Sequence, residues 1–220
     1  MDRVTVVTHP AVADRLVRLR EGATPVPVFR RLIEEIGTFL AFEATRDLEV
    51  NDAGFVSPVA AGVGKRIATP PVVAPILRAG LGLLPGFLAV IDDAVVAHLG
   101  FFRDPATLAA VPYYANLPDD LSGVRVFALD PMLATGNSGT AALDVLKERG
   151  ARDVAFLCVL ASPSGIAQLQ ARHPDAKIVT CAVDEALNER GYIVPGLGDA
   201  GDRMFGSASS VPMGYRTHGA

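Results

Sequence analysis

The stretch 129-LDPMLATGNSGTAALD-144 decides the fold, because within it an apolar strand passes into a helix. The preceding run 124-VRVFAL-129 is apolar almost throughout, which is typical of a strand buried on both faces. The helix is expected over Ser138–Gly150, with Gly150 as its C-cap. Between strand and helix stand a carboxylate, Asp130, and a run of small residues. Such a loop has no hydrophobic role, so it is either a plain connection or a binding site.

Small residues let the backbone of this loop approach a ligand closely. The amides of residues 134–139 and the amino terminus of the helix would face a bound anion, with the hydroxyls of Thr135 and Ser138 as further donors. Asp130 would accept hydrogen bonds from sugar hydroxyls, so loop and acid together suggest a ribose 5-phosphate moiety. An ordinary strand-to-helix turn with an Asx cap is the alternative. The loop is not a Walker loop, because the G-x-x-x-x-G-K-[ST] pattern is missing.

Outward from this loop, short apolar runs alternate with helical segments. Apolar strands joined by helices predict an α/β fold in which helices flank a parallel sheet. Ahead of the sheet, a helix starting near Thr24 has an apolar face of Phe29, Leu32, Ile33, Ile36, Phe39 and Leu40. Strands are expected over 71–77, 94–102, 124–129, 154–160 and 177–183, and further helices over 79–91, 138–150 and 165–173.

Two segments break this alternation. Residues 103–120 hold three prolines and two tyrosines with little core-forming pattern, so we expect a protruding arm or lid there. Residues 188–206 are rich in glycine, yet they also contain carboxylates and apolar side chains. Residues 207–220 have no periodicity and predict a loose tail. We therefore expect one domain over residues 1–206.

Composition excludes several classes of function. Half of the 220 residues are apolar, which excludes a mainly disordered chain, and the net charge of −4 disfavours non-specific nucleic-acid binding. The amino terminus is too charged for a signal peptide, and the most apolar stretch, 79–91, is shorter than the ~20 residues of a membrane span. We expect a soluble, cytoplasmic protein without membrane contact. Cys158 and Cys181 lie in apolar runs and predict buried thiols, and the four histidines share no metal-binding motif.

Five segments of the chain resemble segments of a known enzyme family. The segment 130-DPMLATGNS-138 resembles the phosphoribosyl-diphosphate signature of type I phosphoribosyltransferases, in the form found in uracil phosphoribosyltransferases. That family commonly has DPMLATGGS, so Asn137 replaces a glycine; asparagine tolerates left-handed backbone angles better than most residues. Four more segments are similar to family segments: 42-FEATRDL-48, 75-PILRAGLG-82, 101-FFRDPATL-108 and 191-GYIVPGLGDAGDRMFG-206. The likeness extends from Thr8 to Gly206.

The resemblance implies a site. It implies uracil contacts from the glycine-rich end, where main-chain N–H and C=O groups would match a small lactam. Asp130 and Asp199 are the candidate catalytic residues, and Asp199 either helps with the uracil proton or serves only in binding and loop structure. For phosphoribosyl diphosphate the implied residues are Arg78, Arg103, Asp130, Pro131, Met132, Leu133, Ala134, Thr135, Gly136, Asn137, Ser138 and Asp199. For uracil they are Ile193, Gly198, Asp199 and Ala200.

The implied reaction joins uracil to 5-phospho-α-D-ribose 1-diphosphate and yields UMP and diphosphate, a step of pyrimidine salvage. The resemblance implies Mg²⁺ as cofactor, bound mainly through the diphosphate rather than by a protein ligand set. Arg103 would reach the diphosphate when the arm closes, and Tyr113 and Tyr114 would either line that lid or pack on a neighbouring subunit. A homodimer or homotetramer is expected, and GTP is a possible allosteric effector.

Three rival functions remain open. A regulator that binds RNA on a phosphoribosyltransferase fold would use a basic surface, whereas this acidic chain has no Lys/Arg cluster. A phosphoribosyltransferase for purines would favour a paired-acid signature, whereas Asp130 is followed by Pro131 and Met132. The third alternative is a degenerate binding module without activity, which Asn137 faintly suggests.

Overall fold

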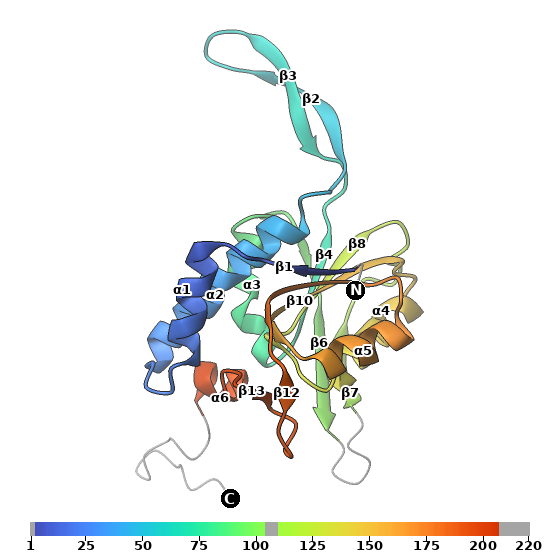
Figure 1. The fold of residues 1–220 in the computed structure, drawn as a ribbon. Helices are drawn as coiled ribbons and strands as arrows, with labels where there is room; N and C mark the ends of the chain where they lie inside the picture. Colours follow the sequence, from blue (N-terminus) through green and yellow to red (C-terminus); the bar gives the residue numbers. More distant parts are fainter. Residues whose placement is uncertain (1–2, 104–109, 207–220) are drawn as a thin grey trace, which may run out of the picture.

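The computed structural model describes residues 3–103 and 110–206. Its central sheet has the strand order β1-β11-β10-β8-β4-β6-β7 (Figure 1). Neighbours along this path are parallel, except that β6 and β7 pair antiparallel. The predicted parallel α/β sheet is therefore confirmed. In sheet order the strands are β1 (Val4–Val6), β11 (Lys177–Val183), β10 (Asp153–Ala161), β8 (Arg125–Leu129), β4 (Val72–Leu77), β6 (His98–Arg103) and β7 (Ala110–Asn116).

Alternating side chains of each central strand enter two different cores. On β8, Phe127 and Leu129 pack with the amino-terminal helices, while Val126 and Ala128 pack with the helices on the other face. Because both faces are covered, β8 is apolar at almost every position, as its sequence predicted. Two short strands extend the sheet in parallel: β5 (Val95–Val96) pairs with β4, and β9 (Met132–Leu133) pairs with β10.

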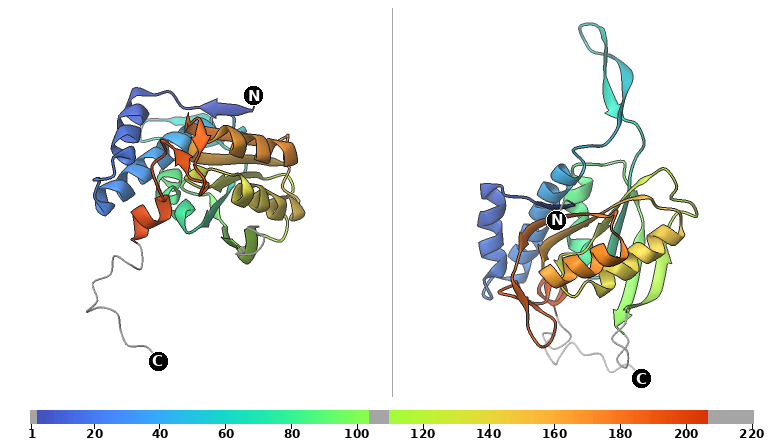
Figure 2. Two further views of the ribbon diagram at one scale, coloured as in Figure 1. Left: turned by 60° about the horizontal axis from the view of Figure 1, so that its bottom comes forward. Right: turned by 45° about the vertical axis from the view of Figure 1, so that its right-hand side comes forward.

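The helices form a layer on each face of the sheet (Figures 1 and 2). The apolar face predicted for the helix starting near Thr24 is confirmed, since Phe29, Leu32, Ile33, Ile36 and Leu40 are buried and the partly buried Phe39 packs against them. The first layer contains α1 (Pro10–Arg20), α2 (Val26–Ala44), the 3-10 helix η1 (Ala79–Gly82), α3 (Leu84–Leu88) and α6 (Ala200–Phe205). The second contains α4 (Asn137–Glu148) and α5 (Pro163–Arg172).

A β-hairpin, formed by β2 (Val50–Val56) and β3 (Ala61–Ile67), projects away from the sheet (Figure 1). No element was predicted there from the sequence. The reason is that the hairpin buries no face against the rest of the described residues: Val56, Val59 and Val63 are largely exposed, and the residues between them are small ones and a proline. Without a buried face, the alternation that marks a strand is lost.

Two predicted elements differ in the structure. The helix expected over 79–91 is instead η1 followed by the short α3, because Gly80, Gly82 and Pro85 interrupt the helical pattern. The strand expected over 94–102 is divided into β5 and β6.

The predicted arm is described in part. Residues 110–116 form strand β7 against β6, while residues 104–109 lie outside the described residues. The carboxy-terminal tail, 207–220, also lies outside them.

Cys158 and Cys181 are buried free thiols, as predicted. Burial raises the pKa of the Cys158 thiol to about 12, so it is inert at neutral pH. Across residues 3–103 and 110–206, none of the helices combines the length and the apolar character that a membrane span needs.

Candidate functional site

The loop between β8 and α4 lies at the carboxyl end of the central strand. The Asp130 amide donates to the carbonyl of Leu157, and the carbonyl of Pro131 accepts from the amides of Val159 and Leu160. These bonds attach the loop to β10 on one side and leave its other side open. Ligands bind at this edge in open parallel sheets.

The left-handed residue of this loop is Gly136, with φ of 85°, directly before α4. A Cβ at Gly136 would lie 2.9 Å from the carbonyl oxygen of Gly165, so the position needs glycine. Asn137 is the first residue of α4 and is exposed. The tolerance of asparagine for left-handed angles therefore has no role here, because residue 137 adopts the helical conformation that any residue can adopt. The substitution leaves the shape of the loop intact.

A hollow of about 390 Å³ joins this loop to the glycine-rich carboxy-terminal segment. Two separate regions predicted to form one site therefore meet in space. Of the predicted residues, Asp130, Met132, Ala134, Ser138, Ile193, Gly198, Asp199 and Ala200 line it. Five residues that were not predicted to contact a ligand also line it: Ala79, Arg190, Gly191, Tyr192 and Gly201. Ala79, Gly191, Tyr192 and Gly201 lie within the family-like segments 75–82 and 191–206, and Arg190 directly precedes the second, so membership of these segments was the available signal.

Several predicted residues of the loop do not line the hollow. Leu133 is buried in the core beneath the loop, and Pro131 is bonded to β10 through its carbonyl. Thr135 accepts weakly from the amide of Asn137 at 3.5 Å. These residues shape the loop, while Ala134 and Ser138 face the hollow.

Asp130 has an unusual electrostatic environment. Desolvation raises its pKa to about 7; the Met132 amide, 3.3 Å from Oδ1, opposes this effect, and the nearby Asp199 carboxylate adds to it. A carboxyl group with a pKa near neutrality exchanges its proton readily at physiological pH. Binding of a cation or of hydroxyl donors at this position would favour the ionised form.

Asp199 is the N-cap of α6, where its Oδ1 accepts from the amide of Asp202 at 2.9 Å. This bond fixes the carboxylate close to Gly201, and both residues line the hollow. Asp199 thus has one oxygen engaged in the cap and one that is available to a ligand.

Arg78 follows β4 and is exposed, with Nη2 3.4 Å from Oδ1 of Asp202. An exposed pair at this distance is weak and easily exchanged for a stronger anion. Arg103 is the last residue of β6, but its side chain lies outside what the structure describes. The predicted approach of Arg103 to the diphosphate therefore stays a prediction.

The carboxylates at the hollow are few for a metal ion held by protein ligands alone. Within the described ranges, no group of three or more His, Cys, Asp or Glu side chains is placed to hold one. Asp130 and Asp199 nevertheless both face the hollow. Mg²⁺ is usually bound through one or two carboxylates together with substrate phosphates, so this pair fits Mg²⁺ that arrives with a diphosphate.

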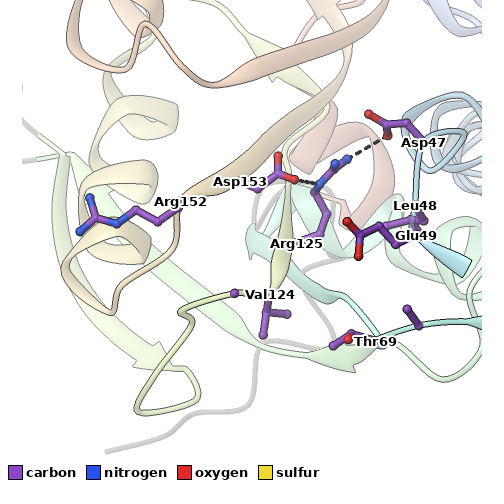
Figure 3. Close-up of a pocket in the computed structure, with 10 residues that line it drawn as sticks. Asp47, Leu48, Glu49, Thr69, Val124, Arg125, Arg152 and Asp153 are labelled. Atoms are coloured by element: carbon purple, nitrogen blue, oxygen red, sulfur yellow. Dashed lines mark hydrogen bonds and ion pairs between the residues drawn. The ribbon is translucent and has the colours of Figure 1, made fainter. Parts of the chain in front are cut away.

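A second hollow, of about 260 Å³, lies at the amino ends of β8 and β10, beside the foot of the hairpin (Figure 3). Arg125 contacts two carboxylates there, Asp153 and Asp47, the latter at 3.0 Å. Hydrogen bonds from Lys177 and Arg125 lower the pKa of Asp47 to about 2. This internally paired cluster contains none of the predicted site residues, and it joins the end of α2 to the sheet.

Comparisons with known proteins agree with the geometry. The family model described as uracil phosphoribosyltransferase matches residues 6–207. A uracil phosphoribosyltransferase of Kineococcus radiotolerans is 52% identical over 208 residues, which cover 93% of this chain and 99% of the relative. One of Rhizobium meliloti is 51% identical over 212 residues, which cover 94% of this chain and 100% of the relative.

Solved structures give the same result for the fold. The AQ2163 protein of Aquifex aeolicus superposes with a TM-score of 0.88 at 33% identity, over 92% of this chain and 98% of that one. The adenine phosphoribosyl transferase of Trypanosoma brucei gives a TM-score of 0.57 at 12% identity, over 83% and 84% of the two chains. The latter similarity concerns the fold alone.

Proposed function

The chain belongs to the uracil phosphoribosyltransferase family, and we propose that it converts uracil and 5-phospho-α-D-ribose 1-diphosphate to UMP and diphosphate. One observation carries the proposal. The small-residue loop around Asp130 and the glycine-rich segment around Gly198 line the same hollow. A sugar phosphate on the first and a base on the second would be held in one orientation for reaction.

The sugar phosphate would occupy the loop between β8 and α4. The amino terminus of α4 and the Ser138 hydroxyl offer donors to the 5-phosphate, and ionised Asp130 accepts from the ribose hydroxyls. Arg78 would exchange its weak contact with Asp202 for the diphosphate. Arg103, closing with the arm over residues 103–120, is proposed as a second cation for the same group.

The reaction exchanges one bond at the ribose ring carbon. The bond from this carbon to the diphosphate oxygen breaks, and uracil N1 forms the new bond and loses its proton. Positive charge develops on the ribose while diphosphate leaves with its electron pair, so guanidinium groups on the diphosphate stabilise the departing charge. Mg²⁺, carried by the diphosphate near Asp130 and Asp199, would supply further charge stabilisation. We assign the N1 proton to Asp199 or to water beside it.

Base recognition would come from main-chain groups. Gly198 has φ of 79°, and Ala200, two residues later, opens the short α6. The Asp199 carbonyl accepts from the Arg203 amide, so the peptide groups that this helix leaves unused are the Gly198 carbonyl and the amides of Asp199 and Ala200. Buried Ile193 supplies an apolar edge. Exposed N–H and C=O groups at fixed positions match the alternating acceptors and donors of uracil.

We also propose that the enzyme is a homodimer or a higher oligomer. The projecting hairpin supports this state, because Val56, Val59 and Val63 are 86%, 95% and 72% exposed. Apolar surface of this kind on a projecting element is typical of an interaction site. Activation by GTP is proposed from the family resemblance. A cytoplasmic location is proposed because phosphorylated sugars and nucleotides do not cross membranes.

One experiment tests the reaction. Uracil, cytosine, hypoxanthine and orotate are each offered with 5-phospho-α-D-ribose 1-diphosphate and Mg²⁺, and diphosphate release is measured with and without GTP. We expect diphosphate release with uracil only, and no release when Mg²⁺ is left out. Release with hypoxanthine and none with uracil would refute the substrate. Release with no base would mark the hollow as a hydrolytic site.

A further inference from the structure

An ion pair joins the amino-terminal helix α1 to residues 193–200, the segment proposed to bind the base and called the base loop below. The pair is formed by Arg20 and Asp184. Nη1 of Arg20 lies 2.6 Å from Oδ2 of Asp184, and Nη2 lies 2.7 Å from Oδ1. Asp184 is buried, with its side chain only 7% exposed. Burial opposes its ionisation, but the bonds from Arg20 and from a backbone amide keep the pKa of Asp184 below its ordinary value. The carboxylate is thus charged and fully engaged at neutral pH.

Both main-chain polar groups of Gly196 are bound by this pair. The Gly196 amide donates to Oδ2 of Asp184 at 2.9 Å, and the Gly196 carbonyl accepts from Nη1 of Arg20 at 2.8 Å. Gly196 lies close against the main chain of Ile193, because a Cβ at residue 196 would be 2.0 Å from the carbonyl oxygen of Ile193. The peptide on each side of Gly196 is therefore fixed in direction.

A second arginine holds the next residue from the same side. Nη1 of Arg203 donates to the carbonyl of Leu197 at 2.7 Å and also to the carbonyl of Leu19, while Nη2 donates to the carbonyl of Glu21 at 2.5 Å. The guanidinium lies over the ring of Phe29, 4.2 Å from its centroid. Arg203 thus joins the base loop, α1 and α2 at one point.

These contacts have a directional consequence. The bonded polar groups of Gly196 and Leu197 are engaged by Arg20, Asp184 and Arg203, and none of these five residues lines the hollow. The hollow is lined instead by the residues on either side, Ile193 before them and Gly198 to Ala200 after them. Because the connection is only a few residues long, a rotation of Gly196 would turn the peptide groups that face the hollow.

We propose that Arg20, Asp184 and Arg203 are positioning residues for base recognition: they hold Gly196 and Leu197 so that the main chain of Gly198–Ala200 presents its donors and acceptors to uracil. This role rests on the proposed function. None of the three residues lines the hollow, so they would act through the main chain that they hold. Base selectivity would then depend on α1, an element remote in sequence from the base-binding segment.

The ion pair could instead serve only to attach α1 to the protein. A matched control separates the two roles, because Arg15 on α1 forms a similar pair with Glu35 on α2, with Nε 2.6 Å from Oε2. That pair also attaches α1, but it makes no contact with the base loop. Glu35→Gln therefore weakens the attachment of α1 without releasing Gly196.

Asp184→Asn is the informative variant. Asparagine offers one acceptor oxygen where Asp184 uses two, so a bond to Arg20 or to the Gly196 amide is lost. We expect the KM for uracil to rise about 10- to 100-fold, as for other small misplacements in a site, with the KM for the phosphoribosyl donor within about two-fold of wild type. Arg203→Lys, which keeps the charge but not the forked donors, should behave similarly. Glu35→Gln should leave both KM values unchanged.

Arg20→Met removes the other partner of the ion pair, but it leaves Asp184 buried and unpaired and could unfold the chain. A double variant keeps the test decisive in that case. Arg20→Met with Asp184→Asn removes both charges, so stability against urea should recover relative to Arg20→Met alone. The KM for uracil should stay high in this stable protein, because Gly196 is still released. A uracil KM that recovers together with stability would assign the pair to α1 attachment alone and would overturn the proposal.

Amide hydrogen exchange gives a readout that does not need turnover. In Asp184→Asn, the peptide containing residues 193–200 should exchange faster than in wild type, while the peptide of α1 should not change. Equal exchange of 193–200 in both proteins would overturn the proposal. Wild-type protein that fails to use uracil would instead overturn the proposed function, and with it the role in base recognition.

Discussion

Gly80 lies directly against the end of β8, so that a Cβ at residue 80 would be only 2.2 Å from the carbonyl oxygen of Leu129. This contact brings η1, which follows Arg78, against the strand that delivers Asp130. The predicted diphosphate loop and the predicted sugar-phosphate loop are thus packed on each other through a glycine. The relative position of Arg78 and Asp130 depends on that close approach.

Gly80→Ala should therefore separate the two loops. Backbone cannot yield as a flexible side chain does, so we expect a loss of about 1–3 kcal/mol in the free energy of unfolding. The KM for the phosphoribosyl donor should rise about ten-fold or more through the misplacement of Arg78. Steady-state kinetics and urea unfolding measure both effects. Gly22→Ala is the control, because no atom lies within 4 Å of a Cβ there; a donor KM equal in both variants would contradict the prediction.

The pH dependence should report Asp130. Its pKa is raised from 3.8 to about 7, so in the free enzyme the ionised form gains population as pH rises through 7. Since the ionised form accepts from the ribose hydroxyls, kcat/KM for the donor should increase through about pH 7 and level off above it. Asp130→Asn should lower turnover at least about 100-fold and remove this ionisation. A wild-type profile that is flat between pH 6 and 8 would exclude Asp130 as the controlling group.

The free energy of unfolding should fall as pH rises, whereas kcat/KM for the donor should increase. A carboxyl with a raised folded-state pKa binds its proton more tightly in the folded than in the unfolded protein. Asp130 therefore costs stability progressively as pH rises from about 4 to about 7, and the cost is constant above that range. Urea unfolding at pH 5 and pH 8 should show a smaller decline for Asp130→Asn than for wild type. An identical decline in both proteins would contradict the assignment.

Asn137, which departs from the family pattern, should tolerate substitution. Asn137→Gly should change kcat and both KM values by less than two-fold, because residue 137 is the exposed first residue of α4. The cost to stability should stay below about 1 kcal/mol, the helix penalty of glycine. Gly136→Ala should lose most donor binding, because it combines φ of 85° with a Cβ 2.9 Å from the Gly165 carbonyl. Equal losses in both variants would mean that residue 137 itself contacts the phosphate.

The parts of this fold that the sequence predicted are those with local patterns. The strand over 124–129 could be found because burial on both faces requires apolar residues throughout. The loop after it could be found because a loop that approaches a ligand closely consists of small residues. The pair of Arg20 and Asp184 could not be found, since 164 positions separate them and single charged residues carry no periodicity. Tertiary contacts between such residues are defined only by the folded chain.

The β2–β3 hairpin escaped prediction for a related reason, and it supplies the last test. Its apolar side chains Val56, Val59 and Val63 are exposed because no part of residues 3–103 and 110–206 covers them, while Phe55 packs on the backbone of Gly62. Lysine at Val56 and Val63 together should prevent burial against a second copy without disturbing Phe55. Sedimentation equilibrium should then give a smaller mass than for wild type. Val17→Lys, at an exposed valine of α1 away from the hairpin, should keep the wild-type mass. If the hairpin variant also keeps that mass, the assembly uses another surface.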